Sequence, residues 1–197
     1  MIALTLLAIG VIWLIFQIPN FDHKYIVKQG KHRFTPRRIG LDFRKSWQAH
    51  VSFDPSCKYD IGDDQTDINK LFGVSYVSWK SIVFVVKSIA QAIEHKDIKL
   101  IKELHHYNSW RLGWWYSGQN IQVMYYMYSN GERISGKITK ANIFELKQIE
   151  VEKLNTAISF GDVFIRANFK GLPLKLGGYF GGNRTAPHRM EYYLKVK

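Results

Sequence analysis

Residues 120–138, "NIQVMYYMYSNGERISGKI", decide the fold class of this 197-residue chain. Side chains alternate along the first half of the stretch, as they do along a strand whose two faces differ. One face would carry Ile121, Val123, Tyr125 and Met127, and the other Gln122, Met124, Tyr126 and Tyr128. The Asn130-Gly131 pair that follows is the strongest short-range signal for a two-residue hairpin turn. We therefore predict an antiparallel hairpin at Asn130-Gly131.

Further short strands are predicted on both sides of the hairpin. Their segments are 46–54, 144–154, 156–169 with a break at Gly161-Asp162, 172–183 and 188–197. The Glu and Lys residues of 144–154 leave a helix open for that segment. Aromatic residues make up 15% of the chain, and they favour strands because flat rings pack well on a pleated surface. We predict a mainly β fold in which residues 46–197 form a jelly-roll-like antiparallel β-sandwich.

Residues 77–106 contain the convincingly helical stretch of this domain. Ile82, Val85, Ile89 and Ile93 recur at helical spacing with lysines between them. The run of β-branched residues at 83–86 leaves a strand open for the first part. The pattern predicts one additional helix beside the sandwich.

The N-terminal segment has the composition of a membrane anchor. From residue 2 to residue 18 only Thr5 and Gln17 are polar, and no residue is charged. Seventeen helical residues span roughly 25 Å, close to the thickness of the hydrocarbon core. A signal peptide is the rival, but basic residues before the apolar run and a small-residue cleavage site after it are both missing. We predict a single-pass transmembrane helix at residues 1–20.

Residues 21–45 are predicted as a basic juxtamembrane linker. The chain has a formal net charge of +12, and part of this excess is concentrated here, which favours attraction to anionic lipid over an acidic polymer. The basic residues are Lys24, Lys28, Lys31, Arg33, Arg37, Arg38, Arg44 and Lys45. Their position after the apolar run favours a cytoplasmic domain, whereas analogy with other jelly rolls favours an extracytoplasmic one, so the side of the membrane stays open. No nucleic-acid-binding module is recognisable.

Residues 105–118, "HHYNSWRLGWWYSG", contain the best candidate for a ligand surface. In a strand from Asn108, Trp110 and Trp114 share one face, while Arg111 and Trp115 share the other. The second face would lie beside Tyr126 and Tyr128 of the hairpin. Aromatic rings and a fixed guanidinium suit sugar rings or planar ligands. The alternative is that aromatic side chains fill both faces of a thick sandwich.

The glycine-rich segment 176–190, "LGGYFGGNRTAPHRM", supplies the other ligand candidates. Glycines allow backbone to approach a ligand closely, which singles out Tyr179, Asn183 and His188. The segment is not a phosphate loop, since no Gly-Lys-Ser/Thr follows.

Metal sites and a thiol nucleophile are weaker candidates. Adjacent His105 and His106 would point in opposite directions from a strand and could not chelate one ion together. The carboxylates of Asp60, Asp63, Asp64 and Asp67 suit calcium by ligand type, but their spacing is not that of an EF-hand loop, and a solvated turn is the alternative. The lone Cys57 fits a small buried residue rather than a nucleophile.

Three motifs resemble a family of small uncharacterised proteins found mainly in Bacteroidetes. They are an Asn-Ser-x-Arg-x-Gly-Trp run from Asn108, a Tyr-x-Tyr-x-Asn-Gly hairpin and a Tyr-Phe-Gly-Gly…Ala-Pro-His ending from Tyr179. The resemblance would cover roughly residues 50–197 and implies no established activity.

A second likeness is to concanavalin-like jelly rolls, which include polysaccharide lyases. The run "KLGGYFGG" is similar to a segment before their closing strand. The likeness implies a carbohydrate-active fold, with Tyr179, Arg111 and one of His105 or His106 as catalytic residues.

Two functions therefore stay open at the sequence level. The first is a membrane-anchored, non-enzymatic subunit of an envelope or membrane complex that binds a protein partner or a glycan through its aromatic and basic surface. The second is a carbohydrate-active enzyme of the polysaccharide-lyase type. The absence of a recognisable acid–base motif favours the first. No cofactor other than calcium is suggested.

Overall fold

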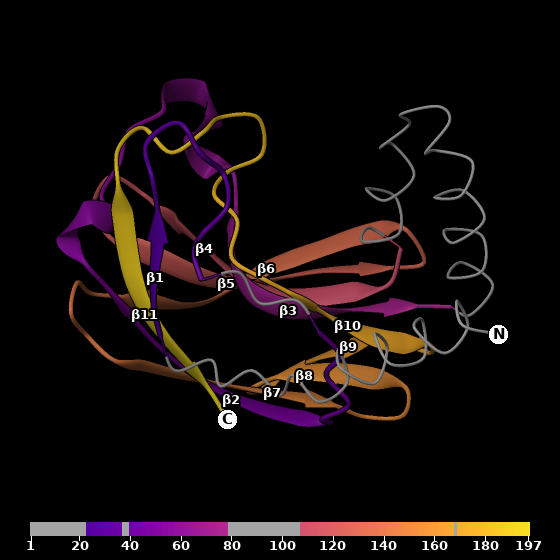
Figure 1. Cartoon of the computed structure of the whole chain (residues 1–197). Helices are drawn as coiled ribbons and strands as arrows, with labels where there is room; N and C mark the ends of the chain where they lie inside the picture. The colour runs from indigo at the N-terminus through magenta and orange to yellow at the C-terminus, as the bar shows by residue number, and fades with distance from the viewer. Residues whose placement is uncertain (1–22, 37–39, 79–106, 168) are drawn as a thin grey trace, which may run out of the picture.

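The computed structural model describes residues 23–36, 40–78, 107–167 and 169–197, and its strands form two sheets that lie face to face (Figure 1). One sheet has the order β1-β11-β2-β7-β8-β9 and the other β10-β3-β4-β5-β6, and all pairings are antiparallel. The first sheet contains β1 (His23–Val27), β2 (Ser46–Phe53), β7 (Lys147–Lys153), β8 (Ala157–Phe160), β9 (Val163–Arg166) and β11 (Met190–Val196). The second contains β3 (Asn69–Val77), β4 (Ser109–Tyr116), β5 (Ile121–Ser129), β6 (Glu132–Ala141) and β10 (Leu172–Leu176).

Aromatic side chains from both sheets meet in the core between them. The Trp47 ring of β2 lies 4.7 Å from that of Trp110 on β4, measured between ring centroids. The corresponding distance from Phe53 on β2 to Trp114 on β4 is 5.2 Å. All four side chains are at most 2% exposed. Burial of such large rings is the main stabilising contribution to the sandwich.

The predicted hairpin is confirmed as β5 and β6. Asn130 has a φ of 52° and Gly131 a φ of 84°, which are the left-handed values that a two-residue turn of this type requires. The turn fixes the register, so Tyr128 lies opposite Arg133. Strands predicted at 46–54, 144–154 and 156–169 are also confirmed, the last as the β8–β9 pair.

Two strands were not predicted from the sequence. Residues 23–27 form β1 at the edge of the first sheet, so the sandwich begins inside the segment expected as a linker. β3 lies inside the second sheet, and nearly all of its residues are buried on both faces, which removes the alternation that marks a half-buried strand.

The expected membrane anchor and the additional helix lie outside the described residues, at 1–20 and for the most part in 79–106. Within the part of the chain that is described, no helix has the length and apolar content needed to cross a bilayer. The described residues include two short 3₁₀ helices, η1 (Pro55–Cys57) and η2 (Gly62–Thr66).

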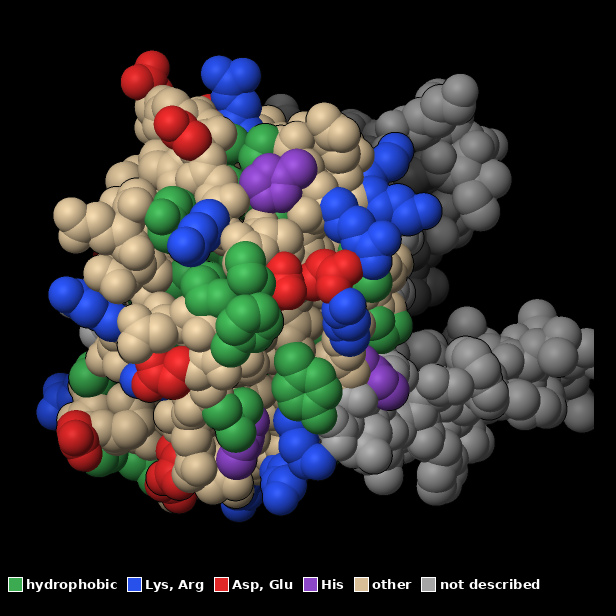
Figure 2. Space-filling view, turned by 90° about the vertical axis from the view of Figure 1, so that its left-hand side faces the viewer, with side chains coloured by type: hydrophobic (Ala, Val, Ile, Leu, Met, Phe, Trp, Pro, Cys, Tyr) green, Lys and Arg blue, Asp and Glu red, His purple; other side chains and the backbone are tan. Residues whose placement is uncertain are grey.

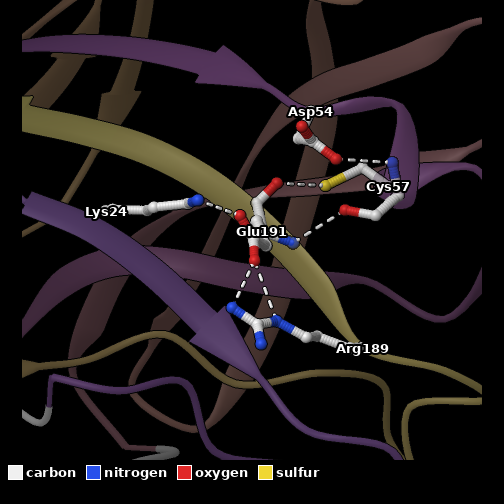
Figure 3. Close-up of polar contacts among 6 residues, drawn as sticks. Lys24, Asp54, Cys57, Arg189 and Glu191 are labelled. Carbon is white, nitrogen blue, oxygen red and sulfur yellow. Dashed lines mark hydrogen bonds and ion pairs between the residues drawn. The ribbon is translucent and has the colours of Figure 1, made fainter.

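The Glu191 residue of β11 fastens η1 to the first sheet (Figure 3). Its carboxylate pairs with Lys24 of β1 and with Arg189, and its backbone carbonyl accepts a hydrogen bond of 3.1 Å from the Cys57 thiol. Burial raises the pKa of that thiol well above its ordinary value, and the side chain is fully buried. Cys57 is thus the small buried residue that the sequence predicted.

Candidate functional site: a cation–tyrosine cluster on the outer face of one sheet

The register of the second sheet gathers cations and tyrosines on the face turned away from the core. Arg111 of β4 lies opposite Gly73 on β3 and Tyr126 on β5. Directly opposite residues of an antiparallel pair project from the same face, so these side chains share a surface. We define the cation–tyrosine cluster by this surface: Lys70, Arg111, Tyr126, Tyr128, Arg133 and Tyr179.

Arg111 is a buried cation at the centre of the cluster. The residue is 9% exposed, and its Nε atom lacks a hydrogen-bond partner. Among the described residues no carboxylate forms an ion pair with it. Burial lowers the pKa of the guanidinium from its ordinary value, although interaction with Tyr126 and Tyr128 acts in the opposite direction. Burial of a guanidinium without an opposite charge destabilises the folded state, and such a group is well suited to bind an anion.

Lys70 lies between two tyrosine rings of the cluster. Its Nζ atom is 5.5 Å from the centroid of the Tyr126 ring and 5.6 Å from that of Tyr179. Burial and, to a smaller extent, the charge of Arg111 together lower the pKa of this ammonium group to about 8. The Lys70 amine donates a long hydrogen bond of 3.4 Å to the Gly181 carbonyl. Lys70 and Arg111 thus place two cations close together, and no described carboxylate forms an ion pair with either of them.

Arg133, Tyr126 and Tyr128 form the other end of the cluster. The Arg133 guanidinium carbon lies 4.8 Å from the centroid of the Tyr126 ring. The hydroxyl groups of Tyr126 and Tyr128 are 2.8 Å apart and share a hydrogen bond. Burial, together with Tyr128, raises the pKa of Tyr126 to about 12. Both tyrosines offer ring faces, over which a cation or the apolar face of a sugar can stack.

Tyr179 is positioned by backbone pairing with β3. The amide of Lys70 donates to the Tyr179 carbonyl at 2.7 Å, and the Tyr179 amide donates to the Lys70 carbonyl at 3.0 Å. The ring stacks on His32, with the centroids 4.9 Å apart and the planes 7° from parallel. The His32 Nδ1 atom lies 3.0 Å from the Phe180 carbonyl, which accepts its hydrogen and leaves Nε2 without a proton in the neutral ring.

The structure brings together most of the predicted ligand residues, but not all of them. Arg111, Tyr126, Tyr128 and Tyr179 belong to the cluster. Trp115 is half-buried on the same face and packs against a small apolar group formed by Ile68, Met124 and Tyr126. Asn183 is exposed in the glycine-rich loop. His188 does not join the cluster, because its Nε2 atom lies 2.8 Å from the carbonyl oxygen of Ser56 in η1. His105 and His106 lie outside the described residues.

The predicted calcium ligands do not converge on one point. Asp64 forms an ion pair with Arg184 at 2.9 Å, while an Asp67 oxygen accepts from the Gly182 amide at 3.0 Å and an Asp60 oxygen from the Gly62 amide at 2.9 Å. In the described ranges no group of three or more potential metal ligands is placed to hold an ion. The acidic loop instead fastens the glycine-rich segment next to the cluster.

Sequence reasoning missed two residues of the cluster, Lys70 and Arg133, and also His32, which stacks on Tyr179. Lys70 belongs to β3, which gives no alternating signal, and His32 belongs to the segment expected as a linker. Arg133 could have been found, because the two-residue turn at Asn130-Gly131 sets it opposite Tyr128.

Comparisons with known proteins give no family. A scan against protein-family models finds no match, and neither does a search of curated proteins, so the resemblance to a Bacteroidetes family gains no support. Among solved structures, an alginate lyase is similar with a TM-score of 0.45 and 12% identity, over 90% of this chain and 72% of that one. A glycosyl hydrolase family protein from Mycobacterium fortuitum has a TM-score of 0.37 and 12% identity, over 77% of this chain and 62% of that one.

A carbohydrate-binding module from Bacillus subtilis has a TM-score of 0.29 and 9% identity, over 88% of this chain and 80% of that one. At these values the likeness assigns neither an activity nor a ligand to this chain. Function has to be inferred from its own side chains.

Proposed function

We propose that the protein binds an anionic glycan on the cation–tyrosine cluster. The observation that carries the proposal is the buried Arg111 guanidinium, which forms no ion pair with a described carboxylate and lies beside Lys70. An unpaired cation in a low-dielectric site attracts a ligand anion more strongly than an exposed cation does. The tyrosine rings add stacking surface for sugar rings.

Binding of acidic and uncharged sugars provides the direct test. Isothermal titration would compare oligogalacturonate with an uncharged oligosaccharide of the same length. We expect binding of the acidic sugar only, weakened by salt because surface charges contribute. Arg133→Gln should reduce the affinity about tenfold, the usual scale for losing one charged hydrogen bond.

Arg166→Gln is the matched control for this experiment. Arg166 is also exposed, but it lies on β9 of the other sheet. The Arg166→Gln variant should bind oligogalacturonate with the affinity of the unaltered chain. An equal loss of affinity in the two variants, or binding of the uncharged sugar as tight as that of the acidic one, would contradict the proposal.

A second candidate function is cleavage of the same glycans by elimination. The position of Tyr179 favours it, since the ring lies beside Lys70 and stacks on His32. Elimination next to a carboxylate needs a cation that neutralises the carboxylate and a group that accepts the proton of the adjacent carbon. The electron pair of that carbon–hydrogen bond forms the new double bond, the carbon–oxygen bond to the leaving sugar breaks, and its oxygen takes a proton from water. Arg111 would serve as the first and Tyr179 as the second.

A spectroscopic assay separates binding from cleavage. A lyase product contains a new carbon–carbon double bond that absorbs ultraviolet light. Under the lyase candidate, absorbance rises during incubation with polygalacturonate, and Tyr179→Phe abolishes the rise. Tyr107→Phe, at a side chain that is 57% exposed, should not change it. If the absorbance does not rise while oligogalacturonate still binds, the lyase candidate is rejected and the protein binds the glycan without cleaving it.

We also propose that residues 1–20 anchor the protein to a cell membrane, where it would meet membrane-protein partners. The uncharged apolar run of residues 2–18 supports this proposal. Deletion of residues 1–20 should release the protein into the soluble fraction, and high salt should release any remainder held by basic residues. Retention of the truncated protein in membranes at high salt would exclude the anchor. Protease protection in vesicles would determine which side the domain faces.

A further inference from the structure

Lys70 has the surroundings of a reactive amine. Among the described residues, its amine donates only to the Gly181 carbonyl, at 3.4 Å, and no carboxylate pairs with it. The side chain is half-buried, so small molecules in solution can reach it. Asp67, the acidic group that acts on Lys70, has one of its oxygens bound to the Gly182 amide.

The neighbouring cations favour the neutral amine. Burial is the largest cause that lowers the pKa of Lys70, and the charges of Arg111 and Arg133 lower it as well. The resulting pKa is about 8. An amine of this kind carries a free electron pair at near-neutral pH far more often than an exposed lysine does. Desolvation and a nearby cation are the two means by which proteins make lysine nucleophilic.

We propose that Lys70 forms an imine with aldehydes that also carry a carboxylate, a class that includes the open-chain reducing ends of acidic sugars. The proposal rests on the proposed function, because Arg111 and Arg133 would hold the carboxylate while Lys70 meets the carbonyl carbon. The rings of Tyr126 and Tyr179 flank the amine.

The reaction balances without an added oxidant or reductant. The nitrogen electron pair of Lys70 forms a bond to the carbonyl carbon, and the carbon–oxygen π pair moves to oxygen. One of the two amine protons then moves from nitrogen to this oxygen, which gives the carbinolamine. The carbinolamine loses its remaining N–H proton, and this proton leaves with the hydroxyl group as water. The product is a carbon–nitrogen double bond plus one water molecule.

Reductive trapping on the full chain tests this inference. Glyoxylate is the probe, an aldehyde with a carboxylate, and cyanoborohydride reduces any imine to a stable adduct that peptide mass spectrometry can locate. At about pH 7.5 we expect Lys70 to be modified at least about tenfold faster than the exposed Lys58, because a larger fraction of it is neutral. The Lys70 rate should level off above about pH 8, where most of its amine is neutral.

Acetaldehyde, which carries no carboxylate, is the control probe. The preference for Lys70 over Lys58 should be smaller with acetaldehyde than with glyoxylate. Arg133→Gln should bring the preference for Lys70 with glyoxylate closer to the preference with acetaldehyde. Arg166→Gln should leave both preferences unchanged. Labelling of Lys70 no faster than of Lys58 overturns the imine proposal, even if oligogalacturonate binds. Preferential labelling of Lys70 in a chain that binds no oligogalacturonate supports the imine and rejects glycan binding, so the two failures are distinguishable.

Discussion

Arg111 has a cost for stability that its surroundings do not offset. The guanidinium is buried beside Tyr126 and Tyr128, its Nε atom lacks a partner, and its pKa is lowered by burial. Burial of a charge without an opposite charge destabilises the folded state, and such groups persist where function requires them. Under the proposed function, Arg111 exchanges stability of the fold for the capacity to bind an anion.

Arg111→Met should separate these two contributions. Methionine keeps much of the side-chain length, removes the buried charge and packs adaptably, so we expect the free energy of unfolding to rise by about 1–2 kcal/mol. Binding of oligogalacturonate should disappear. Urea denaturation and isothermal titration measure the two effects. A destabilised variant would show that the guanidinium has a structural role instead.

The adjacent tryptophans of β4 should respond differently to truncation. Trp114 is 0% exposed between the sheets and contacts Phe53, so Trp114→Ala should cost about 3–5 kcal/mol. Trp115 is half-buried on the outer face near Tyr126. Trp115→Ala should cost about 1 kcal/mol or less and weaken glycan binding. Thermal unfolding of both variants measures this difference in stability. Equal losses of stability would show that Trp115 is also part of a core.

The side on which each β4 residue lies could be predicted from alternation alone. Trp114 and Trp115 occupy the two faces that the sequence indicated, and so do Arg111 and Tyr126. His188 could not be placed in this way, because a loop rather than a strand positions it against Ser56. Because side chains alternate along a strand, the position of a residue in the sequence predicts which face of the sheet it lies on. The conformation of a loop depends on tertiary contacts, which the sequence pattern does not show.

At the scale of elements, β3 shows where sequence patterns fail. The strand is covered on both faces, so its apolar residues do not alternate, and a register shift separates Lys70 from Phe72 where it pairs with β4. Such a bulge re-aims side chains and is found often near functional sites. The hairpin of β5 and β6 was predictable because its turn residues and its alternation agree.

Gly73 of β3 makes room for Arg111 on β4. A Cβ atom built on Gly73 would lie 2.7 Å from Cγ of Arg111 and against the Trp110 carbonyl oxygen. Gly73→Ala should therefore destabilise the fold by about 1–3 kcal/mol, as overpacking does. It should also weaken oligogalacturonate binding more than the lost stability explains, because Arg111 is displaced. Urea denaturation and titration check both effects, and unchanged binding in a folded variant would contradict this role.

On the whole-molecule scale, charge is distributed differently over two faces of the sandwich. Acidic and basic side chains are interspersed with hydrophobic ones on the side where β1 and β11 lie (Figure 2). The cation–tyrosine cluster on the other sheet holds Lys70, Arg111 and Arg133 without a carboxylate partner among the described residues. From the net charge of +12, the sequence favoured attraction to anionic lipid, and it did not indicate the outer face of this sheet.

The same cluster makes stability depend on pH through Lys70. Its pKa is about 8 in the folded chain, against an ordinary value of 10.5. Between these values the unfolded chain binds more protons than the folded chain, so the contribution of Lys70 to stability rises with pH. Below about pH 8 both states are protonated and the cost of burial is constant. The groups that face the amine are Asp67, Arg111, Tyr126, Arg133 and Tyr179.

Lys70→Met isolates this contribution, because methionine cannot titrate. The free energy of unfolding of the unaltered chain, minus that of the variant, should increase by about 1–3 kcal/mol from pH 8 to pH 10.5. Affinity of the unaltered chain for oligogalacturonate should fall over the same window, because the neutral amine no longer attracts the anion, while the variant should bind weakly throughout. Urea denaturation followed by circular dichroism at a series of pH values gives the difference. A difference that stays constant above pH 8 would mean that Lys70 keeps its proton, and the loss of its charge could then explain neither the pH dependence nor the reactivity of the amine.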